Sequence, residues 1–210
     1  MTDGSDLDRP HVFLPAEGEP TGPPLLLLHG TGGNEHDLLP LRDALSRRAA
    51  VLSVRGTVLE NGMPRFFRRL GEGVFDEDDL RRQADALADF VAAAGAAYGI
   101  EPGRLVAVGF SNGANIASAM LLRRPEVLAG AVLLGAMIPY AEPPAADLTG
   151  RLVVISNGER DFMISATMTD TLAQQLRDRG AEITVMPHPG GHQIDVAGLQ
   201  QIKTMLATRT

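Results

Sequence analysis

The chain has 210 residues, of which 44% are hydrophobic, and a formal net charge of -7 at pH 7. This length suits one domain around one core and leaves no room for a large cap domain. The acidic balance argues against nucleic acid or an anionic membrane as a partner, because both attract clustered Lys and Arg. Since the chain has no cysteine, thiolate nucleophiles, disulfides and zinc-thiolate sites are excluded.

Residues 1–24 form an N-terminal extension rich in Pro and Gly, in which only HVFL, residues 11–14, has the composition of an edge strand. The first ten residues lack the basic and apolar regions of a signal peptide. No apolar run approaches the ~20 residues of a membrane-spanning helix. We therefore expect a cytoplasmic protein whose folded domain comprises residues 25–210.

Short aliphatic runs alternate with segments of helical periodicity along this domain. The runs suit strands buried on both faces, and they are 25–28, 51–54, 104–108, 130–134, 151–155 and 182–186. The helical segments are 38–48, 77–98, 112–123, 166–179 and 196–207. Asp76 is the expected N-cap of the longest helix. The alternation predicts an α/β fold with a mostly parallel central sheet and helices on both faces.

The segment GFSNG, which contains Ser111, matches the G-x-S-x-G pattern between a predicted strand and a predicted helix. Its glycines allow a sharp turn that pushes the serine hydroxyl outward. A second Ser-Asn-Gly, at 156–158, has Val154 in place of the first glycine, so the same turn would be crowded there. We predict that Ser111 is a nucleophile and that the second copy forms a turn. The alternative for Ser111 is a helix cap in a glycine-rich turn.

A nucleophilic serine needs a base and an orienting carboxylate. Asp161 is the expected acid, because it lies in the loop that leaves a predicted strand; a capping Asp is the alternative. Asp147 and Asp170 are weaker candidates, since the first precedes that strand and the second lies within a helix. His192 is the expected base, because two glycines let its loop curl back over the sheet, whereas His188 lies between two prolines. The order Ser, Asp, His is that of α/β-hydrolases.

The loop HGTGGNEHD follows the first strand of the domain and is rich in glycine. We expect the backbone amides of Thr31 and Asn112 to form an oxyanion hole. The loop lacks the Lys of a phosphate-binding loop and the third Gly of a dinucleotide-binding loop. A metal site at His29, His36 and Asp37 is a weak alternative, since this spacing matches no known ligand set. We therefore expect neither a metal nor a cofactor.

A long excursion between the strand at 51–54 and the following helix contains the motif RFFRR. We predict that Arg65, Phe66, Phe67 and Arg68 bind substrate: the phenylalanines would contact an acyl or aryl group, and an arginine would hold a carboxylate or phenolate. The alternative is internal ion pairing of the arginines. The candidate partners are Glu60, Asp76, Glu77 and Asp78.

At HGTGGNEHDLLPL, RFFRR, GFSNGAN and GGH, the chain resembles the small phospholipase/carboxylesterase group of α/β-hydrolases. This group includes acyl-protein thioesterases and bacterial dienelactone-hydrolase-like proteins. The RFFRR and SNGAN versions look most like those of bacterial hydroquinone-related hydrolases. The resemblance covers nearly the whole chain from Leu25. It implies an α/β-hydrolase fold and a triad of Ser111, Asp161 and His192 that acts on small esters or thioesters.

Two departures from the group's patterns narrow the expected activity. Thioesterase members usually carry Gln and Pro where this chain has Asn112 and Ser165, and dienelactone hydrolases proper use a Cys nucleophile. We therefore predict a serine carboxylesterase, a carboxylic-ester hydrolase that cleaves a small-molecule ester through an acyl-enzyme on Ser111. The alternatives are a thioesterase or lysophospholipase with the same triad, and a non-catalytic ligand receptor of the same fold. We expect no nucleic-acid or membrane partner. The sequence is compatible with a homodimer.

Overall fold

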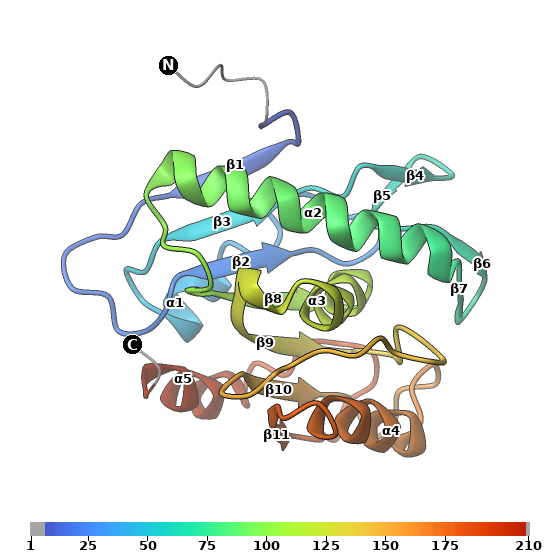
Figure 1. The fold of residues 1–210 in the computed structure, drawn as a ribbon. Coiled ribbons are helices and arrows are strands. Elements are labelled where there is room, and N and C mark those ends of the chain that lie inside the picture. Colours follow the sequence, from blue (N-terminus) through green and yellow to red (C-terminus); the bar gives the residue numbers. More distant parts are fainter. Residues whose placement is uncertain (1–6, 209–210) are drawn as a thin grey trace.

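The computed structural model describes residues 7–208, so the first six residues of the N-terminal extension lie outside it. Its centre is a seven-stranded sheet with the order β1-β3-β2-β8-β9-β10-β11 (Figure 1). The strands are β1 (His11–Leu14), β2 (Leu25–Leu28), β3 (Val51–Val54), β8 (Leu105–Phe110), β9 (Leu128–Leu134), β10 (Leu152–Ser156) and β11 (Glu182–Val185). Strand β1 runs antiparallel to β3 at one edge, and all other neighbouring strands are parallel. The predicted α/β fold is confirmed.

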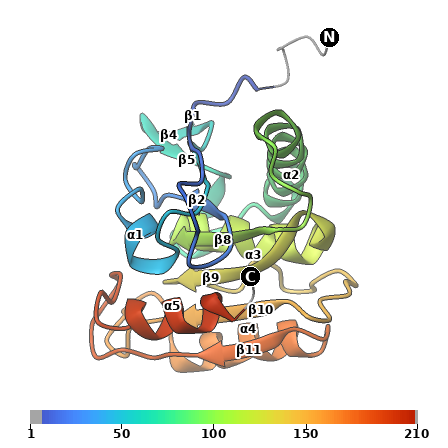
Figure 2. The ribbon, with the colours of Figure 1, turned by 90° about the vertical axis from the view of Figure 1, so that its left-hand side faces the viewer.

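Helices cover both faces of this sheet. They are α1 (Leu41–Leu45), α2 (Glu77–Tyr98), α3 (Asn112–Arg123), α4 (Ala166–Arg177) and α5 (Leu199–Ala207), and a 3-10 turn (Pro125–Val127) leads from α3 into β9. Side chains from α2, α3 and α4 belong to one core cluster with Leu26 and Leu28 of β2. Those from α1 and α5 belong to a second cluster with Leu25 and Leu27. Figure 2 shows α1 and α5 on one side of the sheet and α2 on the other. Alternating strand side chains thus build two hydrophobic layers.

The long helix α2 begins and ends at clear signals. The carboxylate of Asp76 accepts a hydrogen bond from the backbone N–H of Asp79 at 3.0 Å, which confirms the predicted N-cap. At the other end Gly99 has a φ of 72°, the left-handed conformation that stops a helix.

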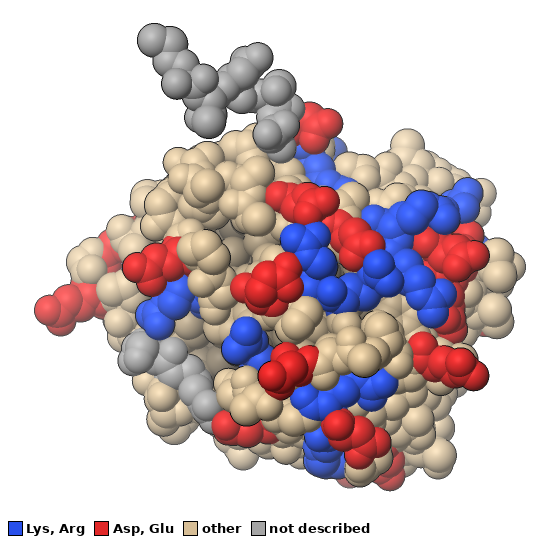
Figure 3. All heavy atoms as spheres, in the orientation of Figure 1, with Lys and Arg blue, Asp and Glu red and all other residues tan. Residues whose placement is uncertain are grey.

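Basic and acidic side chains are intermixed over the face in Figure 3, in keeping with pairs such as Arg82 with Asp79. Within residues 7–208, no helix is both long and apolar enough to cross a membrane.

The excursion between β3 and α2 contains two hairpins that the sequence analysis did not predict. They are formed by β4 (Val58–Glu60) with β5 (Met63–Arg65), and by β6 (Arg69–Gly71) with β7 (Val74–Phe75). Both lie on the side toward which the arrowhead of β2 points in Figure 1. This is the carboxyl edge of the parallel strands, where open α/β sheets bind their ligands.

Candidate active site

Ser111 lies at the tight turn between β8 and α3. Its φ of 53° and ψ of -114° put a residue other than glycine in a strained backbone conformation. The turn depends on Gly113, where a Cβ atom would overlap the carbonyl oxygen of Leu28. A short loop can therefore reverse the chain while α3 packs directly over β2. This geometry is that of the nucleophile turn of α/β-hydrolases.

Ser111, His192 and Asp161 form one hydrogen-bonded chain. The Nε2 atom of His192 lies 2.9 Å from Ser111 Oγ, and its Nδ1 atom lies 2.6 Å from Asp161 Oδ2. The backbone N–H of Met163 donates to Asp161 Oδ1 at 2.9 Å, so both carboxylate oxygens are bound. Because a carboxylate only accepts, Nδ1 of His192 donates and Nε2 presents its lone pair to the serine hydroxyl. The structure brings the three predicted residues together; their catalytic role stays a prediction.

The loops that carry the acid and the base are joined along their backbones. Glu159 N–H donates to the carbonyl of His188 at 2.8 Å, and Arg160 N–H donates to the carbonyl of Gly190 at 3.0 Å. His188 N–H in turn donates to the carbonyl of Asn157 at 3.2 Å. His188 is buried within this pairing, with 4% of its surface exposed, and it does not contact Ser111. The relative position of Asp161 and His192 is thus held by main-chain hydrogen bonds.

The two predicted oxyanion donors, the amides of Thr31 and Asn112, line the same cavity as Ser111. Within residues 7–208, neither backbone N–H has a protein acceptor, so both can bind a substrate oxygen. The Asn112 amide also begins α3, and the amino end of a helix favours negative charge. Both residues are held by the excursion: Arg65 Nη1 donates to Thr31 Oγ1 at 2.6 Å, and Phe66 N–H donates to Asn112 Oδ1 at 2.7 Å.

The cavity beside Ser111 has a volume of about 310 Å³. Four apolar side chains from separate loops and strands contribute to its walls, and they are Phe75, Phe110, Met137 and Met163. Arg65 and Arg69 supply its charged lining. A cavity of this size is at the small end of ligand-binding pockets, which favours a small substrate.

The structure corrects the predicted pocket wall at RFFRR. Phe66 and Phe67 are 1% and 0% exposed and belong to the hydrophobic core, where Phe67 packs edge-on against Phe75. Large aromatic side chains gain most free energy when fully buried, which explains why this pair turns inward. Arg68 also lies away from the cavity, with 60% of its side chain exposed, and it pairs with Asp76 at 3.1 Å. Of the four predicted residues, Arg65 alone lines the cavity.

His29 is buried at the start of the loop that carries Thr31, and both of its ring nitrogens are hydrogen-bonded. Nε2 accepts the backbone N–H of Gly56 at 3.0 Å, so Nδ1 carries the proton and donates to the carbonyl of Gly30 at 2.6 Å. Burial lowers the pKa of His29, which keeps the ring neutral. His36 is exposed beside Glu35. In the part of the chain that the structure describes, no three His, Asp or Glu side chains are grouped to hold a metal ion.

Two asparagines that the sequence analysis did not assign to the site brace the loop after β9. Asn115 Oδ1 accepts the N–H of Met137, and Asn157 Oδ1 accepts the N–H of Ala136, both at 2.8 Å. Asn157 also donates to the carbonyl of Ala136 at 3.1 Å. Since Met137 lines the cavity, these contacts fix one of its walls. The signal was present in the sequence, because both asparagines belong to the Ser-Asn-Gly copies or follow one closely.

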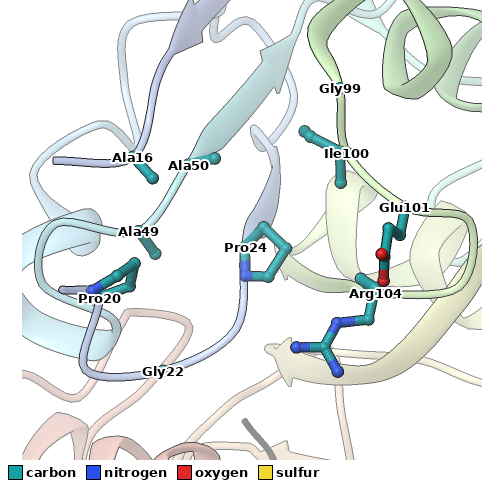
Figure 4. Close-up of a pocket in the computed structure, with 10 residues that line it drawn as sticks. All are labelled: Ala16, Pro20, Gly22, Pro24, Ala49, Ala50, Gly99, Ile100, Glu101 and Arg104. Carbon is teal, nitrogen blue, oxygen red and sulfur yellow. The ribbon is translucent and has the colours of Figure 1, made fainter. Parts of the chain in front are cut away.

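A second hollow of about 460 Å³ lies at the opposite edge of the sheet (Figure 4). Pro24, Ala50 and Arg104 line it just before β2, β3 and β8 begin, so it faces the amino ends of the strands. Among the residues that the structure describes, none that lines this hollow is a serine or a histidine. The candidate catalytic residues are therefore grouped at the carboxyl edge, beside Ser111.

Comparisons with known proteins agree with this geometry. Residues 10–210 match the Phospholipase/Carboxylesterase family model. The chain is 48% identical over 170 residues to MhqD of Bacillus subtilis, a protein named as a hydrolase, with 81% of this chain and 85% of the relative covered.

Two solved carboxylesterases share the fold. That of Bacillus cereus is 42% identical with a TM-score of 0.93, covering 98% of this chain and 97% of that one. That of Mesorhizobium loti is 30% identical with a TM-score of 0.89, covering 97% of this chain and 96% of that one. The expected family is thus confirmed: the chain is a hydrolase that belongs to the phospholipase/carboxylesterase family of α/β-hydrolases.

Proposed function

We propose that the protein is a serine carboxylesterase that cleaves small carboxylic esters through an acyl-enzyme on Ser111. The observation that carries this proposal is the hydrogen-bonded chain from Ser111 through His192 to Asp161, beside two unbound backbone amides. Nucleophile, base, orienting acid and oxyanion donors are the complete set that acyl transfer by a serine requires.

In the first half of the reaction, Nε2 of His192 accepts the proton of Ser111 as Oγ attacks the ester carbonyl carbon. Negative charge develops on the carbonyl oxygen, and the N–H groups of Thr31 and Asn112 donate to it. Asp161 stabilises the imidazolium that forms. When the tetrahedral intermediate collapses, the bond to the alkoxy oxygen breaks, and His192 gives its proton to the leaving alcohol.

In the second half, water takes the place of the alcohol. His192 removes a proton from this water, whose oxygen attacks the acyl carbon, and the same two amides again hold the oxyanion. The bond to Ser111 Oγ then breaks and Oγ regains a proton from His192. The acid leaves and the enzyme returns to its starting state. The reacting groups of this scheme are the three side chains of the triad, the two backbone amides and one water molecule.

The size and lining of the cavity support small esters over long-chain lipids. A volume of about 310 Å³ with walls that include Phe110 and Met137 suits a short acyl or aryl group. The residue after Ser111 is Asn112, where thioesterase members usually carry Gln, and its side-chain oxygen accepts a backbone N–H of the excursion. Carboxylic esters of short chain are therefore the proposed substrate class.

The test is a panel of p-nitrophenyl esters of graded acyl length, run beside matched thioesters and combined with a fluorophosphonate probe. We expect hydrolysis of short esters and labelling of Ser111, identified by peptide mass spectrometry. Thioester turnover that greatly exceeds ester turnover would favour a thioesterase. A chain that hydrolyses no ester or thioester and resists the probe would instead be a ligand receptor.

A further inference from the structure

The cavity beside Ser111 carries an excess of positive charge. Among residues 7–208, the charged side chains on its lining are Arg65 and Arg69. Both pair with one carboxylate, that of Glu60: Arg65 Nε lies 3.2 Å from Oε2, and Arg69 Nε donates to Oε1 at 2.8 Å. Two guanidinium groups and one carboxylate leave one net positive charge at the wall of the cavity.

Burying this positive charge in the protein interior has an unfavourable free energy. Arg65 has only 4% of its side chain exposed, and its burial lowers its pKa, while the neighbouring Arg69 acts in the same direction. A buried cation is stable only when anions or hydrogen-bond acceptors compensate it. Nη2 of Arg65 and Nη1 of Arg69 have no acceptor within the described part of the chain. The pair thus has both charge and N–H donors to offer to a further anion.

The pair also lies next to the reacting atoms. Arg65 donates to the side chain of Thr31, whose backbone amide is a proposed oxyanion donor. Arg69 is the more accessible of the two, with 31% of its side chain exposed, and it lines the same cavity as Ser111. An anion held by these arginines would therefore lie in the same cavity as an ester carbonyl that meets Ser111.

We propose that Arg69, together with the more deeply buried Arg65, forms an anion subsite that selects esters bearing a carboxylate near the scissile carbonyl. The proposal rests on the esterase function proposed above and specifies its substrate class. A carboxylate matches the single net charge of the cluster, and its planar pair of oxygens fits the donor fork of a guanidinium. A phosphate monoester dianion would bring one negative charge too many.

The test compares monomethyl succinate with methyl butyrate, in which a methyl group replaces the carboxylate. The variant is Arg69→Gln, and the matched control is Arg68→Gln, which removes a neighbouring arginine that does not line the cavity. We expect Arg69→Gln to lower kcat/KM for the anionic ester relative to the neutral one by about tenfold or more. Arg68→Gln should leave that ratio unchanged, and Arg69→Lys should give an intermediate ratio. An equal loss on both esters, or an unchanged ratio, in Arg69→Gln overturns the proposal.

A binding measurement separates this proposal from the esterase function. In the Ser111→Ala background, calorimetry compares succinate with butyrate, with and without Arg69→Gln, after melting curves have established that each variant is folded. Arg69-dependent binding of succinate without hydrolysis of any ester by the wild type would support the subsite and reject the esterase. Ester hydrolysis with equal, Arg69-independent binding of both acids would reject the subsite and leave the esterase standing.

Discussion

The two Ser-Asn-Gly copies both lie at carboxyl ends of strands, β8 and β10, but they differ in backbone conformation and in their contacts. Ser111 has a positive φ and is hydrogen-bonded to a histidine. Ser156 is the last residue of its strand, and its carbonyl accepts the N–H of Gly135. The first copy turns sharply into a helix, and the second opens into the loop of Asp161. The same tripeptide thus forms a tight strand-to-helix turn in the first copy and the start of a loop in the second. Gly109, two residues before Ser111, permits the first turn, because an added Cβ there would overlap the carbonyl of Gly113.

The glycines of the two copies are needed for different close approaches. At Gly113 an added Cβ would overlap a carbonyl of β2, whereas at Gly158 it would overlap the carbonyl oxygens of Gly190 and Gly191 in the loop of the base. The first glycine therefore lets a helix pack on the sheet. The second lets the acid loop and the base loop touch.

The largest expected difference between the copies is in catalysis. Ser111→Ala should lower kcat by on the order of 10⁴-fold or more, because it removes the attacking oxygen. Ser156→Ala should leave kcat within about twofold, because within residues 7–208 no hydrogen bond joins its hydroxyl to Ser111, Asp161 or His192. Steady-state kinetics on one short ester, with labelling by a fluorophosphonate, measures both. Labelling at Ser156 would reverse our assignment of the two copies.

The two histidines next to the second copy should differ nearly as much. His192→Ala should cost about as much activity as Ser111→Ala, since the two side chains act as one unit. His188→Ala should retain most of the activity and reduce stability by about 1 to 3 kcal/mol, because His188 is buried and accepts the N–H of Gly190. Measuring kcat and the melting temperature for both variants checks this. A greater loss of kcat in His188→Ala would mean that the base is misassigned.

Replacing Gly158 should separate loop geometry from folding. Gly158→Ala forces the loop of His192 away, and a displacement of about 1 Å of a catalytic group can cost about 10²-fold in rate. Gly71→Ala is the control, because an added Cβ there meets nothing within 4 Å. We expect kcat to fall in the first variant and to stay unchanged in the second. Wild-type kcat in Gly158→Ala would show that the contact between the loops does not position the base.

The smallest effect concerns pH and His29, which lies beneath the loop that faces the first copy. Burial lowers its pKa in the folded protein, so below about pH 6.5 the unfolded chain takes up a proton there before the folded chain does. Its contribution to stability is therefore present above that pH and is lost as pH falls, by at most about 1.4 kcal/mol per pH unit. Urea unfolding between pH 7 and 5 measures this slope. The slope should be smaller in His29→Gln, and equal slopes would contradict the assignment.

The sequence predicted best those parts that depend on local patterns. The bounds of α2 and α3 were predicted correctly, because a cap, a left-handed turn or an apolar period marks each end. The sequence also placed the tight turn at Ser111 and the loops of His192 and Asp161 at one edge of the sheet, since each follows an aliphatic run; their catalytic roles stay predictions. Such features need only a few neighbouring residues to be specified.

The excursion was predicted poorly because its structure depends on contacts between distant residues. Its four strands are two or three residues long, too short for a period to appear. The pair Phe66 and Phe67 is as compatible with a pocket wall as with a core, and only packing against α2 and α3 decides between them. Arg69 was considered for ion pairing but not predicted to line the cavity, for the same reason: its place there follows from the second hairpin.

The excursion also holds the proposed oxyanion donors, and this limits the ways in which substrate specificity can change. Pro64 accepts the N–H of Gly32 at 2.9 Å, Arg65 holds Thr31, and the backbone of Phe66 holds Asn112. An insertion or exchange of this segment that reshapes the cavity would therefore also move the proposed oxyanion donors. New specificity should arise by single side-chain replacements at the rim, such as Met163 or Phe75, more readily than by grafting a foreign loop.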